Sequence, residues 1–307
     1  MRTLRIAALL TALCGSVQAQ TRGPGPILLL LPGSTRALAM GETYLTMAAD
    51  PEAIFINPAL LQNARGIAGS LQRYGSASTL SSLTTATDVG FGFGVQILEY
   101  APVIITAAEE IGSPHGLSER GPAAAGEVVA SIVYMRTFFG KVRLGVAGKW
   151  AQHWGAGFSE GVPALDIGTT VNPFNWLGLA LGVQNLGGNL EVGQLEYDLP
   201  TRYTVYASTR SRAVGPLDVS LAARAGLNEN ENLTGGLGAE VGYWPFSGLN
   251  FYARAGGRFG RIGTAGEVEQ SRITAGGGMT FRRVSLDYAW EPFSEAADAH
   301  RIGLRFR

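Results

Sequence analysis

The sequence contains a single cysteine, Cys14, which lies within the first twenty residues. A chain processed after those residues would carry no thiol, which excludes cysteine catalysis, thiolate metal sites and disulfides. Histidine is also scarce. His115, His153 and His300 are too far apart in the sequence to suggest a metal site or a Ser-His-Asp set. We therefore expect a protein that is not an enzyme and that uses neither a cofactor nor a metal.

Charge and long apolar runs are limited as well. Charged residues make up 16% of the chain, the formal net charge is zero, and only Lys141 and Lys149 are lysines. Nucleic-acid-binding proteins need a basic face, so we exclude a nucleic-acid partner. After the first twenty residues no run approaches the roughly 20 apolar residues of a membrane helix. If the chain crosses a membrane, it must do so as a closed barrel, because an open strand edge cannot be satisfied in lipid.

The first residues have the pattern of a secretory signal. Two arginines precede the apolar stretch Ile6 to Leu13, and Val17-Gln18-Ala19 places small residues at the cleavage position. We predict a signal peptide over residues 1–19 and a mature chain that begins at Gln20.

Glycine is abundant, with 43 residues, and from residue 65 onward apolar and polar residues alternate. In the stretch 217–227, leucine, valine and alanine occupy the odd positions, while the even positions include Asp218, Ser220 and Arg224. A period of two predicts half-buried strands. The predicted strands lie near 65–74, 79–85, 89–98, 125–138, 141–153, 162–172, 177–187, 201–209, 216–227, 232–244, 248–258, 271–282, 284–291 and 299–307.

A soluble sandwich would alternate in the same way, but the strand lengths and the charges in mid-strand favour a barrel with a wet interior. The fold class predicted is all-β, a transmembrane antiparallel β-barrel of about 14 strands with an N-terminal periplasmic hatch. Its domains are the signal peptide 1–19, the hatch or plug segment 20–64 and the outer-membrane barrel 65–307.

The connections between predicted strands alternate in length, which predicts an orientation in the outer membrane. Short connections are expected at 86–88, 139–140, 173–176, 210–215, 245–247 and about 283, and longer ones at 99–124, 154–161, 188–200, 228–231, 259–270 and 292–298. Short turns are typical of the periplasmic side, so we expect both termini to be periplasmic. Aromatic residues beside the short turns predict a membrane-interface girdle: Phe138, Phe139, Phe174, Trp176, Tyr243, Trp244, Phe246, Phe251 and Phe281.

The stretch 33–61 differs from the rest of the chain. It is rich in small residues, does not alternate, and is interrupted by Gly41, Pro51 and Pro58. This composition predicts a compact segment folded inside the barrel. Asn57 is expected to cap a turn before Pro58, with a ligand-binding role as the alternative. Asp50 is expected to start a helix.

This stretch resembles the N-terminal block of the PorV/PorQ family, within the wider FadL-like superfamily of outer-membrane barrels. The matching residues are Gly33, Arg36, Ala37, Met40, Gly41, Ala49, Asp50, Asn57, Pro58 and Ala59. Further stretches agree in order: Asp166-Ile167-Gly168, Gln184-Asn185-Leu186-Gly187, Leu199-Pro200, Ser285 to Ala289 and His300 to Leu304. Two positions depart from PorV/PorQ: Glu42 replaces a common second glycine, and Leu60 makes Asn-Pro-Ala-Leu closer to the fatty-acid transporters.

The resemblance implies a hatch built from Arg36, Gly41, Asp50, Asn57, Pro58 and Ala59. It implies a non-enzymatic binding or assembly role in protein export of the type IX secretion kind, or in envelope organisation. The alternative is a FadL-like uptake channel for small hydrophobic compounds. Implied partners are outer-membrane lipids, secretion components or exported proteins, or a small hydrophobic ligand. The aromatic Phe306 near the C-terminus resembles the signal read by the barrel assembly machinery.

Charged residues are predicted to line the barrel interior. They are Arg143, Lys149, Arg202, Asp218, Arg224, Glu240, Arg254, Arg258, Arg272, Asp287, Arg301 and Arg305. Nine are basic and three acidic, which indicates either an anion-favouring interior or a ladder of structural ion pairs around the hatch, and we favour the ion pairs.

Overall fold

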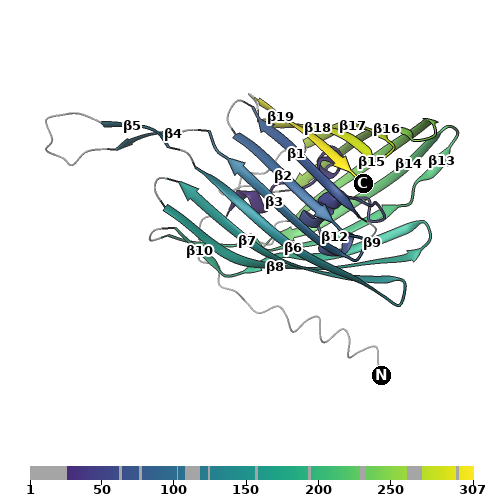
Figure 1. The fold of residues 1–307 in the computed structure, drawn as a ribbon, viewed down its shortest axis with the longest axis horizontal. Coiled ribbons are helices and arrows are strands. Elements are labelled where there is room, and N and C mark those ends of the chain that lie inside the picture. Colours follow the sequence, from purple (N-terminus) through teal and green to yellow (C-terminus); the bar gives the residue numbers. More distant parts are fainter. Residues whose placement is uncertain are drawn as a thin grey trace, which may run out of the picture.

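The computed structural model describes residues 26–61, 64–75, 78–101, 103–107, 118–123, 125–155, 158–192, 195–228, 233–260, 272–294 and 297–307. Fourteen long strands form one antiparallel sheet that closes on itself through pairing of β12 with β14, which confirms the predicted barrel (Figure 1). The barrel strands are β1 (Gly66–Tyr74), β2 (Ser78–Ala86), β3 (Phe91–Glu99), β6 (Gly126–Phe138), β7 (Val142–Gly155), β8 (Phe158–Phe174), β9 (Leu177–Gly187), β12 (Arg202–Thr209), β14 (Leu217–Asn228), β15 (Leu233–Phe246), β16 (Leu249–Gly260), β17 (Arg272–Phe281), β18 (Val284–Ser294) and β19 (Ala297–Phe306).

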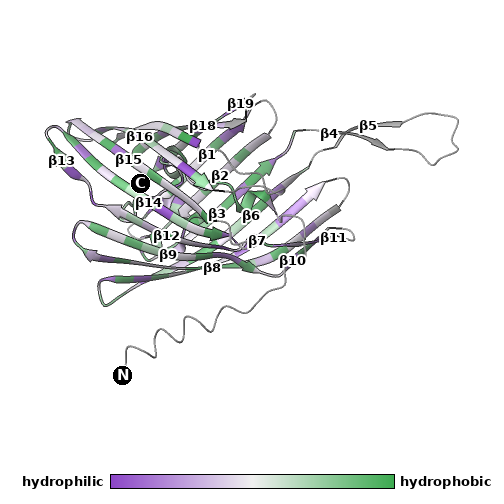
Figure 2. Ribbon diagram, turned by 180° about the vertical axis from the view of Figure 1, so that it is seen from behind, coloured by the Kyte–Doolittle hydropathy of each residue, from purple (hydrophilic) through white to green (hydrophobic). Residues whose placement is uncertain are grey.

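The alternation in the sequence separates the two faces of the wall. On β14, Leu221 and Leu227 face outward and are about half exposed, whereas Ser220 and Arg224 face inward and are buried. The same alternation appears along other strands as bands of hydrophobic and hydrophilic colour (Figure 2). An apolar outer face around a polar interior is the arrangement of transmembrane barrels. Within the described ranges, no helix is long and apolar enough to cross a membrane.

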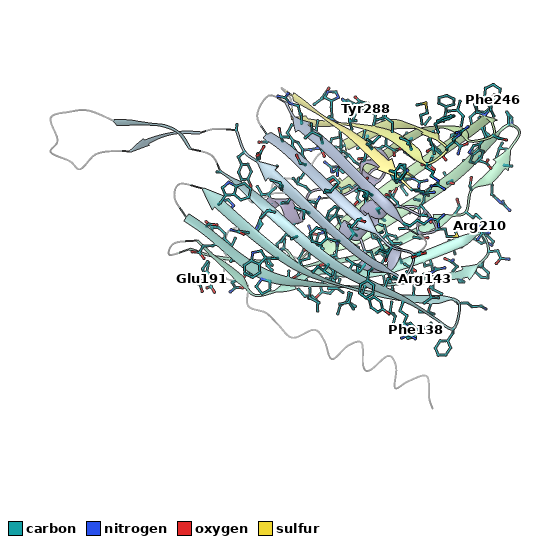
Figure 3. The ribbon with its side chains drawn as sticks, in the orientation of Figure 1. Phe138, Arg143, Glu191, Arg210, Phe246 and Tyr288 are labelled. Carbon is teal, nitrogen blue, oxygen red and sulfur yellow. The ribbon has the colours of Figure 1, made fainter. Side chains whose placement is uncertain are left out.

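One end of the barrel is closed by tight turns. At the β6–β7 turn, Phe139 and Gly140 have positive φ angles of 52° and 67°, and the Lys141 N–H donates to the Phe138 carbonyl at 3.2 Å to close the turn. The aromatic residues predicted for a girdle lie at this end and are exposed, which rules out a role in a sandwich core. Figure 3 shows two of them, Phe138 and Phe246, projecting away from the ends of their strands.

The predicted pattern of loop lengths is wrong in two places. β7 and β8 continue their pairing to Gly155 and Phe158, so the expected loop 154–161 reduces to residues 156–157. β18 and β19 likewise leave only residues 295–296 between them, where a loop over 292–298 was expected. In both places a glycine- or proline-containing sequence that indicated a loop is carried into the hairpin by cross-strand hydrogen bonds.

Other connections contain strands that were not predicted. β4 (Val103–Ala107) pairs with β5 (Ser118–Ala123) in a hairpin that extends from the barrel, and β10 (Asn189–Val192) pairs with β11 (Leu195–Asp198) (Figure 1). A short strand, β13 (Arg212–Val214), pairs with β14. We call the end that carries the β4–β5 and β10–β11 hairpins the long-loop end, and the opposite end the short-turn end.

Residues 26–61, here called the inner segment, lie against the inward faces of the strands. The inner segment contains four short helices: η1 (Ile27–Leu29), α2 (Thr35–Ala39), η2 (Pro51–Phe55) and η3 (Pro58–Leu61). Ser34 caps α2, and Asp50 caps η2 by accepting a hydrogen bond from the Glu52 N–H at 3.0 Å, as predicted for Asp50. The predicted signal peptide and the first residues of the predicted hatch lie outside the described residues.

Candidate functional site

The inner segment begins at the long-loop end, where η1 is held by a buried carboxylate. Glu127 on β6 accepts hydrogen bonds from the backbone N–H of Leu28 at 2.7 Å and of Ile27 at 3.1 Å. The Tyr100 hydroxyl donates to the same carboxylate at 2.5 Å, and the His153 ring lies 3.5 Å from it. The N–H groups of Ile27 and Leu28 are the first of the turn and have no acceptor within it, so Glu127 supplies one, while Leu30 donates within the turn to Ile27 at 2.8 Å.

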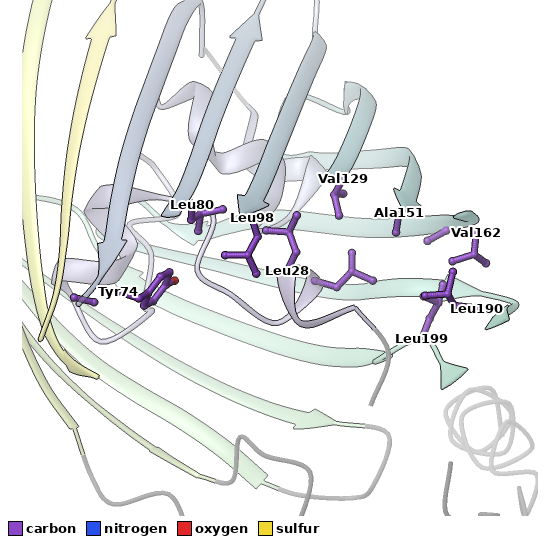
Figure 4. Close-up of a cluster of buried hydrophobic side chains, with 12 residues drawn as sticks. Leu28, Tyr74, Leu80, Leu98, Val129, Ala151, Val162, Leu190 and Leu199 are labelled. Atoms are coloured by element: carbon purple, nitrogen blue, oxygen red, sulfur yellow. The ribbon is translucent and has the colours of Figure 1, made fainter. Parts of the chain in front are cut away.

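The leucines of η1 enter an apolar cluster at the same end. Leu28 and Leu29 are buried beside side chains from seven barrel strands and from the 188–201 connection (Figure 4). The other members are Tyr74, Leu80, Leu98, Val129, Ala151, Val162, Ala164, Leu190, Leu199 and Ala299. This mouth cluster is an apolar site that the protein's own leucines fill.

Further along, the inner segment turns sharply at Met40-Gly41 and presses against glycines of β15 and β16. A Cβ atom on Gly256 would lie 2.1 Å from the Met40 carbonyl carbon, and one on Gly238 would lie 2.4 Å from the Met40 oxygen. Gly41 itself has a φ of 68° and packs on the Gly257 backbone. The glycine richness of the barrel therefore lets two backbones meet without an intervening side chain.

The Asn57-Pro58-Ala59 tip lies against a second group of glycines on the opposite wall. Gly145, Gly168 and Gly182 are cross-strand neighbours on β7, β8 and β9, and we call them the glycine wall. A Cβ on Gly168 would lie 1.9 Å from Asn57 Oδ1, and one on Gly145 would lie 2.4 Å from the Ala59 nitrogen. The tip therefore touches the barrel backbone directly.

Asn57 is completely buried and is fixed by two hydrogen bonds. Its Oδ1 accepts from the Ala59 N–H at 2.9 Å, which confirms the predicted turn cap. Its Nδ2 donates to the Leu181 carbonyl on β9 at 2.8 Å. One side chain therefore shapes the tip and also anchors it to the wall.

Beside this contact, the strands β8 and β9 form a bulge. Leu165 pairs with Leu186 and Ile167 with Val183, which leaves Asp166 opposite two residues of β9. One of these, Asn185, has a φ of 61° and donates its N–H to Asp166 at 2.8 Å. The other, Gln184, donates to the Phe55 carbonyl at 3.1 Å. The Asp166 and Gln184-Asn185 landmarks, far apart in sequence, thus converge next to the inner segment.

The outer face of the glycine wall carries an apolar depression of about 570 Å³, which we call the outer hollow. Its apolar side chains come from six strands, β7 to β9, β12, β14 and β15. The hollow is lined by Leu144, Ile167, Gly168, Thr169, Leu181, Gly182, Val183, Tyr203, Thr204, Val205, Ala225, Gly226, Leu227 and Leu233. Since Gly168 and Gly182 line the hollow on one side and contact Asn57 on the other, one layer of backbone separates the two.

The four charged residues of the inner segment all pair with the barrel. Arg36 pairs with Glu240, Asp50 with Arg305 at 3.2 Å, and Glu52 with Arg301 at 3.8 Å. The Glu52 carboxylate also accepts from the Thr35 N–H at 2.9 Å. The fourth, Glu42, pairs with Arg224 at 3.1 Å and also with Arg258. Of the predicted hatch residues, Arg36 and Asp50 therefore form ion pairs with the barrel strands.

The predicted lumen charges all lie on inward-facing positions, but they have different partners. Arg254 bridges Glu240 and Asp287, and Arg305 also reaches Asp287. Arg301 donates to the carbonyls of Pro32 and Gly33. Outside this network, Lys149 pairs with Asp166 at 2.6 Å, Arg202 donates to the Leu30 carbonyl at 3.4 Å and Arg143 to Thr170 at 3.5 Å. Asp218 and Arg272 are half-buried on their strands.

The sequence prediction of nine basic and three acidic interior residues is wrong in its balance. Glu127, Asp166 and Glu291 are also buried on inward-facing positions, and the inner segment adds Glu42 and Glu52. Glu127 and Glu291 lie inside the strands predicted over 125–138 and 284–291, and Glu291 has the same parity as the predicted lumen residue Asp287, so the prediction omitted residues that alternation places inside. Asp166 and Glu291 pair within the wall, with Lys149 and Arg258, whereas Glu127, Glu42 and Glu52 bind across the contact between the wall and the inner segment.

The environment of Glu42 fixes its charge state. Burial, the largest single influence, would raise the pKa of this carboxyl, but the guanidinium groups of Arg258 and Arg224 outweigh it and hold the pKa at about 2. Glu52 responds in the opposite way, because burial raises its pKa and Arg301 only partly offsets that effect. Glu42 is therefore an anion at neutral pH.

The histidines do not form a catalytic group with the residues described. His153 lies near Glu127 at the mouth, and His300 Nδ1 lies 2.8 Å from the Tyr288 hydroxyl on the outer face. His115 lies outside the described residues.

Comparisons with known proteins show a similar fold in solved structures. The Pseudomonas putida toluene transporter TodX aligns with a TM-score of 0.54 and 12% identity, over 94% of this chain and 98% of that one. A Pseudomonas aeruginosa FadL homologue aligns with a TM-score of 0.51 and 10% identity, over 89% and 96% of the two chains. The CymD monoaromatic hydrocarbon channel aligns with a TM-score of 0.53 and 11% identity, over 88% and 95%. No protein-family model and no curated protein matches the sequence.

The TM-scores show a shared β-barrel fold. The comparisons provide no support from sequence for PorV/PorQ in particular.

Proposed function

We propose that the chain is an outer-membrane channel for small apolar molecules, in which the inner segment serves as the hatch. The observation that carries this proposal is the glycine wall, where the Asn57 tip and the apolar outer hollow are separated by backbone alone. The outer hollow has the size of a typical small-molecule site. The names of the structural neighbours, a toluene transporter and a monoaromatic hydrocarbon channel, support the same class of ligand.

In this proposal the short-turn end faces the periplasm and the long-loop end faces outward, as in other outer-membrane barrels. The exposed apolar belt contacts membrane lipid, and the aromatic residues at the short turns lie at the membrane interface. The barrel assembly machinery would insert the chain through its last strand. The protein acts by binding and passage rather than by catalysis.

The polarity of the interior favours one route through the barrel. An apolar molecule can replace Leu28 and Leu29 in the mouth cluster, because the side chains there already accommodate aliphatic groups. Below that cluster the interior is crossed by buried ion pairs such as Arg254–Asp287, and passing an apolar molecule through them would break charged contacts. A sideways exit at the glycine wall, after movement of the Asn57 tip, avoids this layer and leads to the outer hollow.

Uptake by whole cells tests the proposal. Cells of a Gram-negative host that produce the chain should accumulate radiolabelled toluene faster than cells with an empty vector. Leu181→Trp, which fills the outer hollow, should reduce the gain, whereas Leu237→Trp, on the outer face of β15 away from the hollow, should not. Equal uptake with and without the protein, at matched amounts in the outer membrane, would contradict the proposal.

A second candidate function is the PorV/PorQ-type role in protein export or envelope organisation. The observation that favours it is the dense packing of the interior, where all four charges of the inner segment are paired with the wall. A barrel that stays closed could act through its outer surface and loops. Purification from membranes of a host with a type IX secretion system should then recover secretion components, and recovery of the barrel alone would count against this role.

A further inference from the structure

The barrel wall and the inner segment carry opposite excess charges across three groups of buried ion pairs. On the wall, five arginines face three carboxylates, which leaves two positive charges in excess. The wall members are Arg224, Arg254, Arg258, Arg301 and Arg305, with Glu240, Asp287 and Glu291. The inner segment contributes three carboxylates and one arginine, an excess of two negative charges, and each of the four pairs with the wall. Counted over these residues of the described part of the chain, the charges sum to zero only when the inner segment is seated.

Glu42 has the most direct role in this neutralisation. Its carboxylate lies between Arg224 on β14 and Arg258 on β16 and is 7% exposed. Arg258 also pairs with Glu291 at 2.9 Å. The Nε group of Arg224 is buried without a hydrogen-bond partner among the described residues, so this guanidinium retains a donor for a further acceptor.

The backbone conformation of Glu42 indicates that its carboxylate is needed between Arg224 and Arg258. Its φ of 60° lies in the left-handed region, which a glycine adopts without strain and a glutamate does not. The chain accepts this conformation while the side chain makes two charged contacts. Glu42 thus resembles a carboxylate ligand that is tethered to the inner segment.

We propose that Arg224 and Arg258 form a binding site for small carboxylates, which Glu42 occupies while the inner segment is seated. When the segment moves, the excess positive charge of the wall draws an anion from solution into the same place. The site gives the open barrel a preference for anions, and it takes ligands that carry a compact carboxylate rather than a neutral polar group. This inference depends on the ion-pair geometry and is independent of whether the chain transports hydrocarbons.

Chemical rescue of a variant tests the site directly. Glu42→Gly removes the carboxylate and suits the left-handed backbone, so the variant should lose thermal stability through charge alone. Acetate should raise the unfolding midpoint of the purified full-length variant in detergent, with a saturating concentration dependence. Acetamide, which has the same shape without the charge, should leave the midpoint unchanged, and Glu42→Gly/Arg258→Met should lose the response to acetate.

An equal response to acetate and acetamide, or a response to acetate that survives removal of Arg258, would overturn the proposal. If Glu42→Gly does not fold, planar-bilayer recordings of the unaltered chain give a second test. Under a potassium chloride gradient, the current through the open barrel should reverse at a potential between zero and the equilibrium potential of chloride. Arg224→Met should shift this reversal potential toward the equilibrium potential of potassium. A cation-selective opening would contradict the anion site.

Discussion

At the scale of single residues, Asn57 shows how little room separates the inner segment from the wall. Its Oδ1 lies 1.9 Å from the place of a Cβ on Gly168, and two hydrogen bonds hold the amide there. We predict that Gly168→Ala lowers the stability of the folded barrel by about 1–3 kcal/mol. Gly148→Ala, on the outward face of the neighbouring strand with no atom within 4 Å of the new Cβ, should change it by less than about 0.5 kcal/mol.

Thermal or denaturant unfolding in detergent measures both variants. Because Asn57→Ala removes the atoms that would overlap with the new methyl group, the double variant Asn57→Ala/Gly168→Ala should be more stable than the sum of the two single changes predicts. Additive losses would show that Asn57 and residue 168 do not meet.

Acid sensitivity is a second prediction at this scale. The pKa of Glu42 is about 2 in the folded chain and near its ordinary value of 4.5 when unfolded, so its ion pairs stabilise the fold fully above about pH 4.5. That contribution, at most about 3 kcal/mol, should be lost as the pH falls from 4.5 toward 2. Glu42→Gln should flatten the decline in unfolding midpoint over this range.

Glu52 should act in the opposite direction. Since burial raises its pKa in the folded chain, its contribution to stability falls as the pH rises above 4.5 through that raised value. Comparing Glu42→Gln with Glu52→Gln over the same pH series separates the two effects. A midpoint that is flat with pH in the unaltered chain from 4.5 to 2 would contradict the assignment for Glu42.

Which single residues matter could be predicted only in part. Asn57 and Asp50 were expected to cap their turns because those roles depend on neighbours in sequence, and both do. The partners of Arg36 and Glu42 lie about two hundred residues away, so no local pattern identifies them. The departure from glycine at position 42 was visible in the sequence, but its meaning required the positions of Arg224 and Arg258.

At the scale of elements, the first turn of the inner segment depends on one strand residue. We predict that Glu127→Ala releases η1, because two backbone N–H groups lose their acceptor and a single turn cannot hold itself. Hydrogen exchange over residues 27–31 should then accelerate by at least about tenfold, which corresponds to a loss of roughly 1.4 kcal/mol of local stability. Glu160→Ala, exposed on β8, serves as the matched control.

Unchanged exchange in Glu127→Ala would show that the mouth cluster alone holds η1. Faster exchange in both variants would instead indicate a general loosening of the long-loop end.

All fourteen barrel strands could be predicted as elements, because their alternation persists over nine or more residues in most of them. Their ends could not be placed as well. At Gly155 and Ser294 the strand continues where glycine or proline suggested a loop, since pairing with the neighbouring strand supplies the hydrogen bonds. The short helices of the inner segment are too short to have a periodic signal, and the caps at Ser34, Asp50 and Asn57 are what mark them.

At the scale of the whole molecule, the apolar belt predicts that the stability cost of an added charge on the outer face depends on its depth in the bilayer. Ile132 is 65% exposed in the middle of β6, and Phe139 is 96% exposed in the turn that follows. In a bilayer, Ile132→Arg should cost about 2–4 kcal/mol, whereas Phe139→Arg should cost at most about 1 kcal/mol. The fraction of heat-modifiable, folded protein in the membrane measures this, and equal losses at both positions would contradict the placement of the belt.

The central claim is that the inner segment moves to let a molecule pass, and a reversible lock tests it most directly. Thr46 Oγ1 on the inner segment lies 2.9 Å from Ser208 Oγ on β12, a separation compatible with a disulfide between cysteines placed there. With the predicted signal peptide removed, no other cysteine would compete. Hydrocarbon uptake by cells carrying Thr46→Cys/Ser208→Cys should fall to the empty-vector rate when oxidised and return on reduction, while the unaltered chain responds to neither treatment. Uptake that continues unchanged through the oxidised lock would contradict a movable hatch.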